Sequence, residues 1–207
     1  LLRERVLGEK ADFRKTDVTP ASRPPALCPG CPHRGFFYTL SKNKNYVVTG
    51  DIGCYTLGSA APLNCMDSVV CMGAGFSAGM GIAKSFEREG VTDKTIFGVM
   101  GDSTFFHSGM TGAAEIIYNN GRMIPCVLDN RITGMTGHQE NPGSGYTITG
   151  EHAYPADIEG VARAFGMTDI HKVNPMDLEA TRKALKEAIA FEGPSLVITR
   201  YPCALKK

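Results

Sequence analysis

Residues 95–103 of the chain read TIFGVMGDS, and residues 124–130 read IPCVLDN. Each stretch is a short apolar run that ends abruptly in polar residues. Neither run alternates apolar with polar side chains, which is typical of a strand buried on both faces of a parallel sheet. Further strands are predicted at residues 46–49 and 195–200, with a weaker one at 69–72 or 168–172.

Helical patterns separate these runs. They are predicted at residues 35–41, 76–88, 108–120, 158–165 and 177–191. In the last of them, Asp177 is suited to cap the first turn. Strands that alternate with helices predict an α/β fold, in which a parallel sheet carries helices on both faces.

The composition is that of an ordinary globular chain. Of its 207 residues, 43% are hydrophobic and 21% are charged, which excludes a mostly disordered chain. The net charge of +1 gives no reason to expect a nucleic-acid partner. No apolar run approaches the roughly 18 residues of a membrane span, so no membrane partner is expected either.

Two segments are expected to lie outside the core. Residues 1–23 are polar and mixed in charge, and prolines follow them, so they are predicted to be a linker or docking segment. Residues 24–207 are then expected to form one domain. Within it, residues 131–155 lack periodicity, and a loop of that length in a compact domain is usually functional.

Polar clusters follow three predicted strands directly, at residues 50–54, 101–103 and 129–130. Ligands of open parallel sheets bind beyond the carboxyl ends of the strands, so these clusters are expected at one edge. Asp102 and Asn130 would supply oxygens to Mg²⁺ bound to a diphosphate. Gly101 would let the backbone approach, and the helix start beyond Ser103 would favour an anion. The alternative is a helix cap at Asp102 and a turn residue at Asn130.

A second glycine-rich stretch precedes the helix predicted at 76–88. Residues 72–81 read MGAGFSAGMG. Gly73 and Gly75 are candidate cofactor-binding positions in a turn that opens this helix. Close packing of the helix on the sheet explains the same glycines equally well.

Four of the seven cysteines stand beside Gly or Pro: Cys28, Cys31, Cys54 and Cys203. The CxxC formed by Cys28 and Cys31 is compatible with zinc, an iron–sulfur cluster or a redox dithiol. The dithiol is the weakest interpretation, because no strand precedes this CxxC. Cys54 and Cys203 follow the first and last predicted strands and could reach the same point. The spacing does not choose between a cubane cluster and a structural zinc.

The remaining cysteines, Cys65, Cys71 and Cys126, lie in apolar settings and are expected to be small buried thiols. An odd number of cysteines without a secretory leader argues against a disulfide framework. The expected compartment is therefore reducing, and we expect a cytoplasmic protein.

The pair Gly101-Asp102-Ser103 and Asp129-Asn130 resembles the thiamine diphosphate motif, which begins Gly-Asp-Gly and ends one helix and one strand later in Asn-Asn. Ser103 and Asp129 depart from that form. The two metal-binding positions are intact, and the resemblance implies the backbone carbonyl of Ile132 as a further Mg²⁺ ligand.

Together with the cysteines, these features closely resemble the cofactor domain of the 2-oxoacid:ferredoxin oxidoreductases, and most of all the α subunit of their indolepyruvate branch. The resemblance rests on residues 28–35, 101–109 and 128–139 and covers residues 24 to 203. It implies a thiamine diphosphate-binding fold. It also implies that Cys28, Cys31, Cys54 and Cys203 hold a 4Fe–4S cluster.

The implied reaction is oxidative decarboxylation of an aryl 2-oxoacid, indolepyruvate, to its acyl-CoA, with electrons passed to ferredoxin. His33 and His138 are candidate catalytic residues, and Thr133, Thr136 and Gln139 of the long loop could line the active centre. Such enzymes also need a carboxylate from a pyrimidine-binding domain, which nothing in this chain resembles. The chain is therefore expected to be part of a larger α subunit that works with that domain and a β subunit.

Three alternatives remain open. The substrate could be another 2-oxoacid, such as pyruvate, 2-oxoglutarate or a branched-chain oxoacid. The enzyme could be a simple decarboxylase without a cluster. The chain could also be a zinc-stabilised, non-catalytic binding module whose four cysteines are purely structural.

Overall fold

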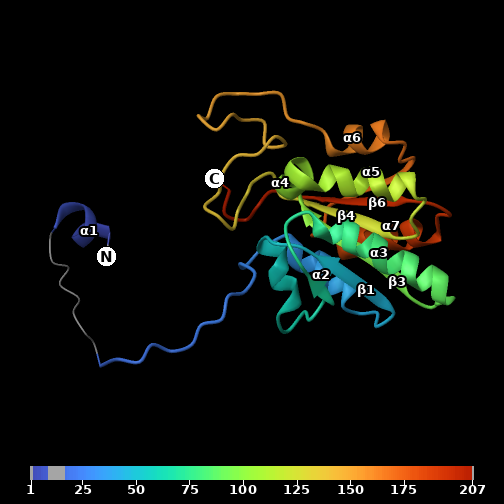
Figure 1. Ribbon diagram of the computed structural model, residues 1–207, viewed down its shortest axis with the longest axis horizontal. Coiled ribbons are helices and arrows are strands. Elements are labelled where there is room, and N and C mark those ends of the chain that lie inside the picture. The colour runs from blue at the N-terminus through green and yellow to red at the C-terminus, as the bar shows by residue number, and fades with distance from the viewer. Residues whose placement is uncertain (1, 9–16, 207) are drawn as a thin grey trace.

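A single parallel sheet organises the computed structural model, which describes residues 2–8 and 17–206 (Figure 1). In these ranges six strands pair in the order β2-β1-β3-β4-β6-β5, and every pairing is parallel. The predicted sheet is confirmed. The weaker candidate at 168–172 corresponds to a strand, whereas the one at 69–72 shares only Val69 with a two-residue strand. The strands are β1 (Tyr46–Gly50), β2 (Ser68–Val69), β3 (Thr95–Gly101), β4 (Ile124–Asp129), β5 (Asp169–Val173) and β6 (Ser195–Arg200).

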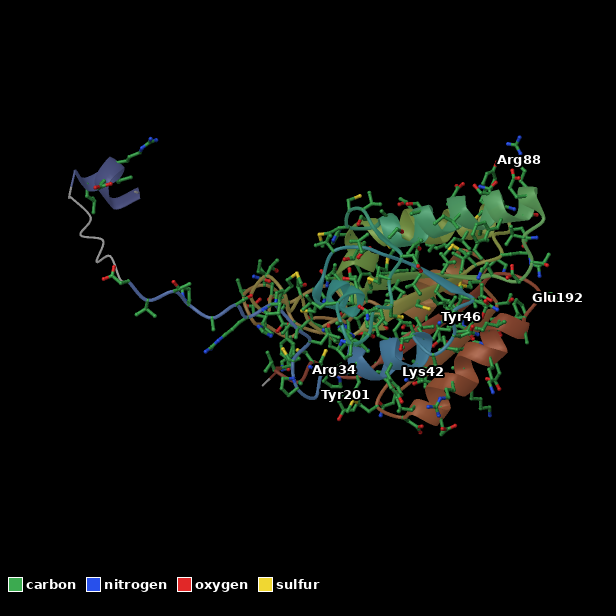
Figure 2. All side chains as sticks on the ribbon, turned by 90° about the horizontal axis from the view of Figure 1, so that it is seen from below. Arg34, Lys42, Tyr46, Arg88, Glu192 and Tyr201 are labelled. Atoms are coloured by element: carbon green, nitrogen blue, oxygen red, sulfur yellow. The ribbon has the colours of Figure 1, made fainter. Side chains whose placement is uncertain are left out.

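Helices cover both faces of the sheet, as the sequence predicts (Figures 1 and 2). One face carries α2 (His33–Leu40) and α7 (Leu178–Ala190), and the other carries α3 (Ala74–Glu89), α5 (Met110–Tyr118) and α6 (Ile158–Ala164). Asp177 caps α7 as expected, because its carboxylate accepts a hydrogen bond from the N–H of Ala180 at 2.9 Å. No helix among the described residues is long and apolar enough to cross a membrane.

The helical segment after β3 begins earlier than the sequence predicts. It starts at Asp102, immediately after the strand, with α4 (Asp102–Thr104) and the π-helical turn η2 (Phe105–Gly109), and continues into α5. The polar residues of this start obscure its periodicity in the sequence. Phe105 anchors it, because this side chain is fully buried in the core. A π-turn within a helix is often found at a functional site.

The β3 run lacks polar alternation because both faces of the strand are buried. Phe97 and Val99 pack into the core beneath α2 and α7, whereas Ile96 and Met100 pack into the core beneath α3 and α5. All four side chains are at most 2% exposed. Polar groups can therefore gather at the carboxyl end of this strand, because both of its faces are buried.

Little of the N-terminal segment contributes to this core. Residues 17–26 are exposed and lie outside helices and strands, and Leu27 is the first side chain to enter the core after them. A short helix, α1 (Leu2–Leu7), precedes this stretch in the chain. Residues 1 and 9–16, which belong to the predicted linker or docking segment, lie outside the described residues, as does residue 207.

Gly75 lets α3 pack directly on the sheet. A Cβ atom at this position would lie 2.4 Å from the carbonyl oxygen of Val99 in β3, which is well inside a van der Waals contact. Gly73 serves a different purpose, since its φ of 92° begins the helix in a conformation that favours glycine. The packing interpretation of the glycine-rich stretch therefore fits Gly75.

Replacing Gly75 by Ala should lower the free energy of unfolding by about 1–3 kcal/mol, because the added methyl group overpacks the α3–β3 contact. Urea unfolding followed by circular dichroism measures this change. Gly81→Ala is the matched control, since Gly81 lies in the same helix and a Cβ there would meet nothing within 4 Å. The control should be neutral or up to about 1 kcal/mol stabilising. Equal loss of stability in both variants would contradict the packing explanation.

Candidate functional site

The carboxyl ends of three neighbouring strands bring polar side chains to one edge of the sheet. Asp51 follows β1, Asp102 follows β3, and Asn130 follows β4, in the spatial order β1-β3-β4. All three are at most 7% exposed. The predicted convergence of the three polar clusters at the sheet edge is therefore present.

A pocket opens at this edge between the strand ends and the long loop. Its walls include most of the predicted site residues, namely His33, Cys54, Gly101, Asp102, Ser103, Asn130, Ile132, Thr133 and Thr136. Gly73, Gly75 and His138 are not among the residues that line it. The N–H of Gly73 instead donates to the carboxylate of Asp51 at 2.9 Å.

Asp102 is a buried carboxylate at the start of a helical segment. It is 2% exposed, and burial, together with the neighbouring charge of Asp129, raises its pKa to about 7. One of its oxygens accepts a hydrogen bond from the side-chain amide of Asn141 at 3.0 Å. None of the ion pairs among the described residues includes Asp102. A divalent cation would supply the missing counter-charge.

Asn130 lies between the pocket and α2. Its side-chain oxygen accepts a 3.3 Å hydrogen bond from the N–H of Ile132, and its side-chain nitrogen lies 3.4 Å from Nε2 of His33. The turn geometry that the alternative interpretation predicts for Asn130 is thus present. It leaves one side-chain oxygen lone pair of Asn130 for a further partner.

His33 is held inside the protein in its neutral form. It opens α2, is 2% exposed, and has a pKa lowered to about 4 by burial. His138, the other candidate, is exposed and has a φ of 63° between the bridge partners Thr133 and Gln139. Only His33 of the two histidines faces the pocket.

The four cysteines near Gly or Pro gather at one side of the pocket. Burial, and after it the nearby thiols of Cys28, Cys203 and Cys54, raises the pKa of the Cys31 thiol to about 11. The thiols of Cys28, Cys54 and Cys203 therefore lie in the neighbourhood of Cys31. Yet no three Cys, His, Asp or Glu side chains in residues 2–8 and 17–206 converge tightly enough to hold one metal ion.

The other three cysteines do not all behave as expected. Cys65 and Cys126 are buried, at 5% and 0% exposure, which agrees with small core thiols. Cys71 is exposed, so the prediction of a buried thiol was wrong there. The prediction rested on the apolar neighbours of Cys71. The strand there, β2, is only two residues long and ends before Cys71, so it does not bury this side chain.

Tyr55 lines the pocket, although the sequence patterns did not single it out. Its hydroxyl donates to the carboxylate of Asp51 and lies 3.1 Å from Oγ1 of Thr104. Its ring occupies the space beside Gly101, where a Cβ atom would lie 2.7 Å from Cε1 of Tyr55. Gly101 is therefore required by the tyrosine that follows Cys54, and this pairing could not be found without the fold.

Asn141 and Arg200 were also missed. Asn141 belongs to the long loop and reaches back to Asp102, which attaches the loop to the pocket. Arg200 ends β6, and its Nε lies 2.6 Å from the buried carboxylate of Asp129. Both contacts join residues that are far apart in the chain, and the only sequence signal was the length of the loop.

The family comparison agrees with the fold. Residues 51–199 match the model of the thiamine pyrophosphate enzyme, C-terminal TPP binding domain. Among solved structures, a 2-oxoglutarate:ferredoxin oxidoreductase from Magnetococcus marinus shares the fold with a TM-score of 0.72 at 20% identity, covering 90% of this chain and 67% of that chain. Benzoylformate decarboxylase from Polynucleobacter necessarius shares it with a TM-score of 0.59 at 18% identity, covering 91% and 36%.

Curated relatives are similar over nearly the whole chain. The indolepyruvate oxidoreductase subunit IorA of Thermococcus kodakarensis is 40% identical over 205 residues, and that of Archaeoglobus fulgidus is 37% identical over 202 residues. These alignments cover 94% and 96% of this chain but 32% of each relative, so the chain spans about a third of their length. The matched residues include β3, β4 and every lining residue of the pocket except His33. By this match the chain belongs to the thiamine pyrophosphate enzymes, whose C-terminal TPP-binding domain it contains.

Proposed function

We propose that this chain is the cofactor-binding part of a thiamine diphosphate-dependent 2-oxoacid oxidoreductase and that it holds an iron–sulfur cluster beside the thiamine cofactor. One observation carries the proposal: Cys54, Asp102 and Asn130 line the same pocket. A candidate cluster ligand and candidate diphosphate–metal ligands thus adjoin one cavity. The similarity to indolepyruvate oxidoreductase subunits supports the same class of reaction.

Asp102, Asn130 and the backbone carbonyl of Ile132 would hold Mg²⁺, while Gly101 and Ser103 would adjoin the diphosphate. The residues fit this task because a buried carboxylate, a side-chain amide oxygen and a carbonyl are hard oxygen donors. Thiamine diphosphate, when bound, supplies the nucleophilic carbon that makes decarboxylation of a 2-oxoacid possible. Asn141 orients the Asp102 carboxylate, and His33 holds the Asn130 side chain in place as a neutral neighbour.

Cys28, Cys31, Cys54 and Cys203 would hold a 4Fe–4S cluster. The thiols of Cys28, Cys54 and Cys203 lie near enough to Cys31 to raise its pKa, so the four cysteines can share one site, in which each would bind a different iron. The cluster, when bound, accepts electrons one at a time. Cys54 is the ligand that adjoins the pocket.

The pocket walls favour an aryl 2-oxoacid such as indolepyruvate. They include the apolar side chains of Ile52, Met72, Leu128, Ile132 and Met135, and no Lys or Arg among the described residues lines them. A second carboxylate, as in 2-oxoglutarate, would have no counter-charge there. In the complete reaction the 2-oxoacid anion and coenzyme A give acyl-CoA, CO₂, a proton and two electrons, which ferredoxin accepts.

The remaining parts of the enzyme would come from outside these residues. A pyrimidine-binding domain or subunit would supply the carboxylate that activates the aminopyrimidine, and a β subunit would complete the assembly. His33, which faces the pocket, is the candidate catalytic residue that this geometry favours. His138 could act only from the exposed tip of its loop.

The anaerobically purified holoenzyme should reduce ferredoxin with indolepyruvate and coenzyme A. We expect kcat/KM for indolepyruvate to exceed that for 2-oxoglutarate by at least about tenfold, because an unpaired carboxylate in an apolar pocket costs more than ~1.4 kcal/mol. Preference for 2-oxoglutarate would overturn the substrate assignment. Failure to reduce ferredoxin with any 2-oxoacid would overturn the reaction itself.

Replacing Cys54 by Ser should remove a cluster, which amounts to about four iron and four acid-labile sulfide per chain. Metal and sulfide analysis of anaerobic holoenzyme measures this loss. Cys71→Ser is the matched control, because Cys71 is exposed and is not among the residues that line the pocket. Iron retained in the Cys54 variant would rule out the cluster, and loss of stoichiometric zinc would identify the alternative site.

In the cofactor-free protein, Asp102 should make stability depend on pH. The pKa of Asp102 in the folded state, about 7, lies above its unfolded value of 3.8, so the folded state binds more protons between these limits. Its stabilising contribution is present at low pH and is lost as the pH rises through about 7, by at most ~1.4 kcal/mol per pH unit. Asp102→Asn should therefore gain stability over the wild type on going from about pH 5 to pH 8. Urea unfolding at each pH measures this difference. If the unfolding free energies of the wild type and the variant changed in parallel with pH, burial would not destabilise the ionised form of Asp102.

A further inference from the structure

The segment that carries Cys203 is bound along the segment that carries Asn130. The N–H of Tyr201 donates to the carbonyl of Asp129 at 3.1 Å, and the N–H of Cys203 donates to the carbonyl of Asn130 at 3.1 Å. Nζ of Lys206 then donates to the carbonyl of Arg131 at 2.9 Å. Residues 129–131 and 201–206 thus stay joined by hydrogen bonds past Arg200, the last residue of β6.

A buried ion pair holds these segments together where the strands end. Asp129 and Arg200 are register partners in the β4–β6 pairing, and Nε of Arg200 lies 2.6 Å from Oδ2 of Asp129. The Asp129 side chain is 2% exposed and that of Arg200 is 27% exposed. Arg131 approaches the other carboxylate oxygen at 3.4 Å, so Asp129 has two cationic partners.

This pair gives a physical reason for a departure from the general thiamine diphosphate motif. The motif ends in Asn-Asn, whereas this chain has Asp129-Asn130. An asparagine at position 129 could not neutralise Arg200, and Arg200 lies three residues before Cys203. The negative charge of Asp129 therefore pairs with Arg200 on β6, the strand that leads to the candidate cluster ligand Cys203.

We infer that Asp129 and Arg200 form a positioning pair that couples the two cofactor sites through Asn130 and Cys203. This inference rests on the proposed function, because it assigns roles to a metal ligand and a cluster ligand. Asn130 faces the pocket with its side chain and binds the Cys203 segment with its backbone carbonyl. A shift of either segment therefore moves the other, and the ion pair sets their relative position.

The coupling has a direct thermodynamic consequence. If bound thiamine diphosphate and Mg²⁺ fix the Asn130 segment, they also hold Cys203 in place and slow the loss of iron. Coupling between the binding free energies of two sites is reciprocal, so an intact cluster should also strengthen cofactor binding. A pair that only stabilises the fold would change the melting temperature without linking the two sites.

The test is the rate at which a chelator, bathophenanthroline disulfonate, removes iron from anaerobic holoenzyme with and without thiamine diphosphate and Mg²⁺. The readout is the iron whose presence depends on Cys54. We expect the cofactor to slow this loss at least about fivefold in the wild type. In Arg200→Met the ratio should fall to about one, because the remaining backbone hydrogen bonds no longer fix the position of the Cys203 segment.

Two further variants keep the test decisive. Arg200→Lys retains a positive charge and should restore part of the protection even if Arg200→Met folds poorly. Arg163→Met is the matched control, since it removes an arginine that pairs with Glu159 on the surface of α6, and it should behave as the wild type. Full protection in a folded Arg200→Met holoenzyme, or none in a wild type that holds both cofactors, would overturn the coupling. A wild type without Cys54-dependent iron would instead overturn the proposed function.

Discussion

Because β3 and β4 are neighbouring parallel strands buried on both faces, their carboxyl ends reach the same edge of the sheet. The residues that follow them, Asp102 and Asn130, are therefore held together at one pocket, and both side chains are buried. This constraint has a cost, since Asp102 is a buried carboxylate without a cationic side chain beside it among the described residues. The same cost makes the site suited to a metal–diphosphate complex, because its metal ion would supply the positive charge that Asp102 lacks.

The neighbouring carboxylate, Asp129, differs from Asp102 because it has cationic partners within the protein. It is equally buried but has Arg200 and Arg131 as partners, so its charge is neutralised within the protein. Two adjacent strand ends thus carry two buried carboxylates. Arginines neutralise Asp129, whereas Asp102 remains available to a ligand. Asp129 faces the segment of Cys203, and Asp102 faces the pocket.

Much of this arrangement is predictable from local sequence. Apolar runs without polar alternation predicted the central strands, and the polar residues after them predicted the edge at which Asp102 and Asn130 meet. The resemblance carried by the motifs agrees with the family model that matches residues 51–199. Local patterns failed at Cys71, whose apolar neighbours did not bury it, and at the helical start at Asp102, where polar residues obscured the periodicity.

Contacts between distant parts of the chain were beyond the reach of the sequence patterns. Gly101 reads as a glycine for backbone approach, yet the ring of Tyr55 fills the space beside it. Asn141 lies 39 residues from Asp102, and Arg200 lies 71 residues from Asp129. No local periodicity reports such pairs, because only the fold brings them together.

The central claim is that a metal–diphosphate site and a cluster site adjoin one pocket through Asp102, Asn130 and Cys54. Electron paramagnetic resonance of reduced holoenzyme, with Mn²⁺ in place of Mg²⁺, tests it most directly. The account predicts that Mn²⁺ bound with thiamine diphosphate speeds the relaxation of the Cys54-dependent cluster signal and that Mg²⁺ does not. An unchanged cluster signal in a sample shown to contain both bound Mn²⁺ and the cluster would contradict it.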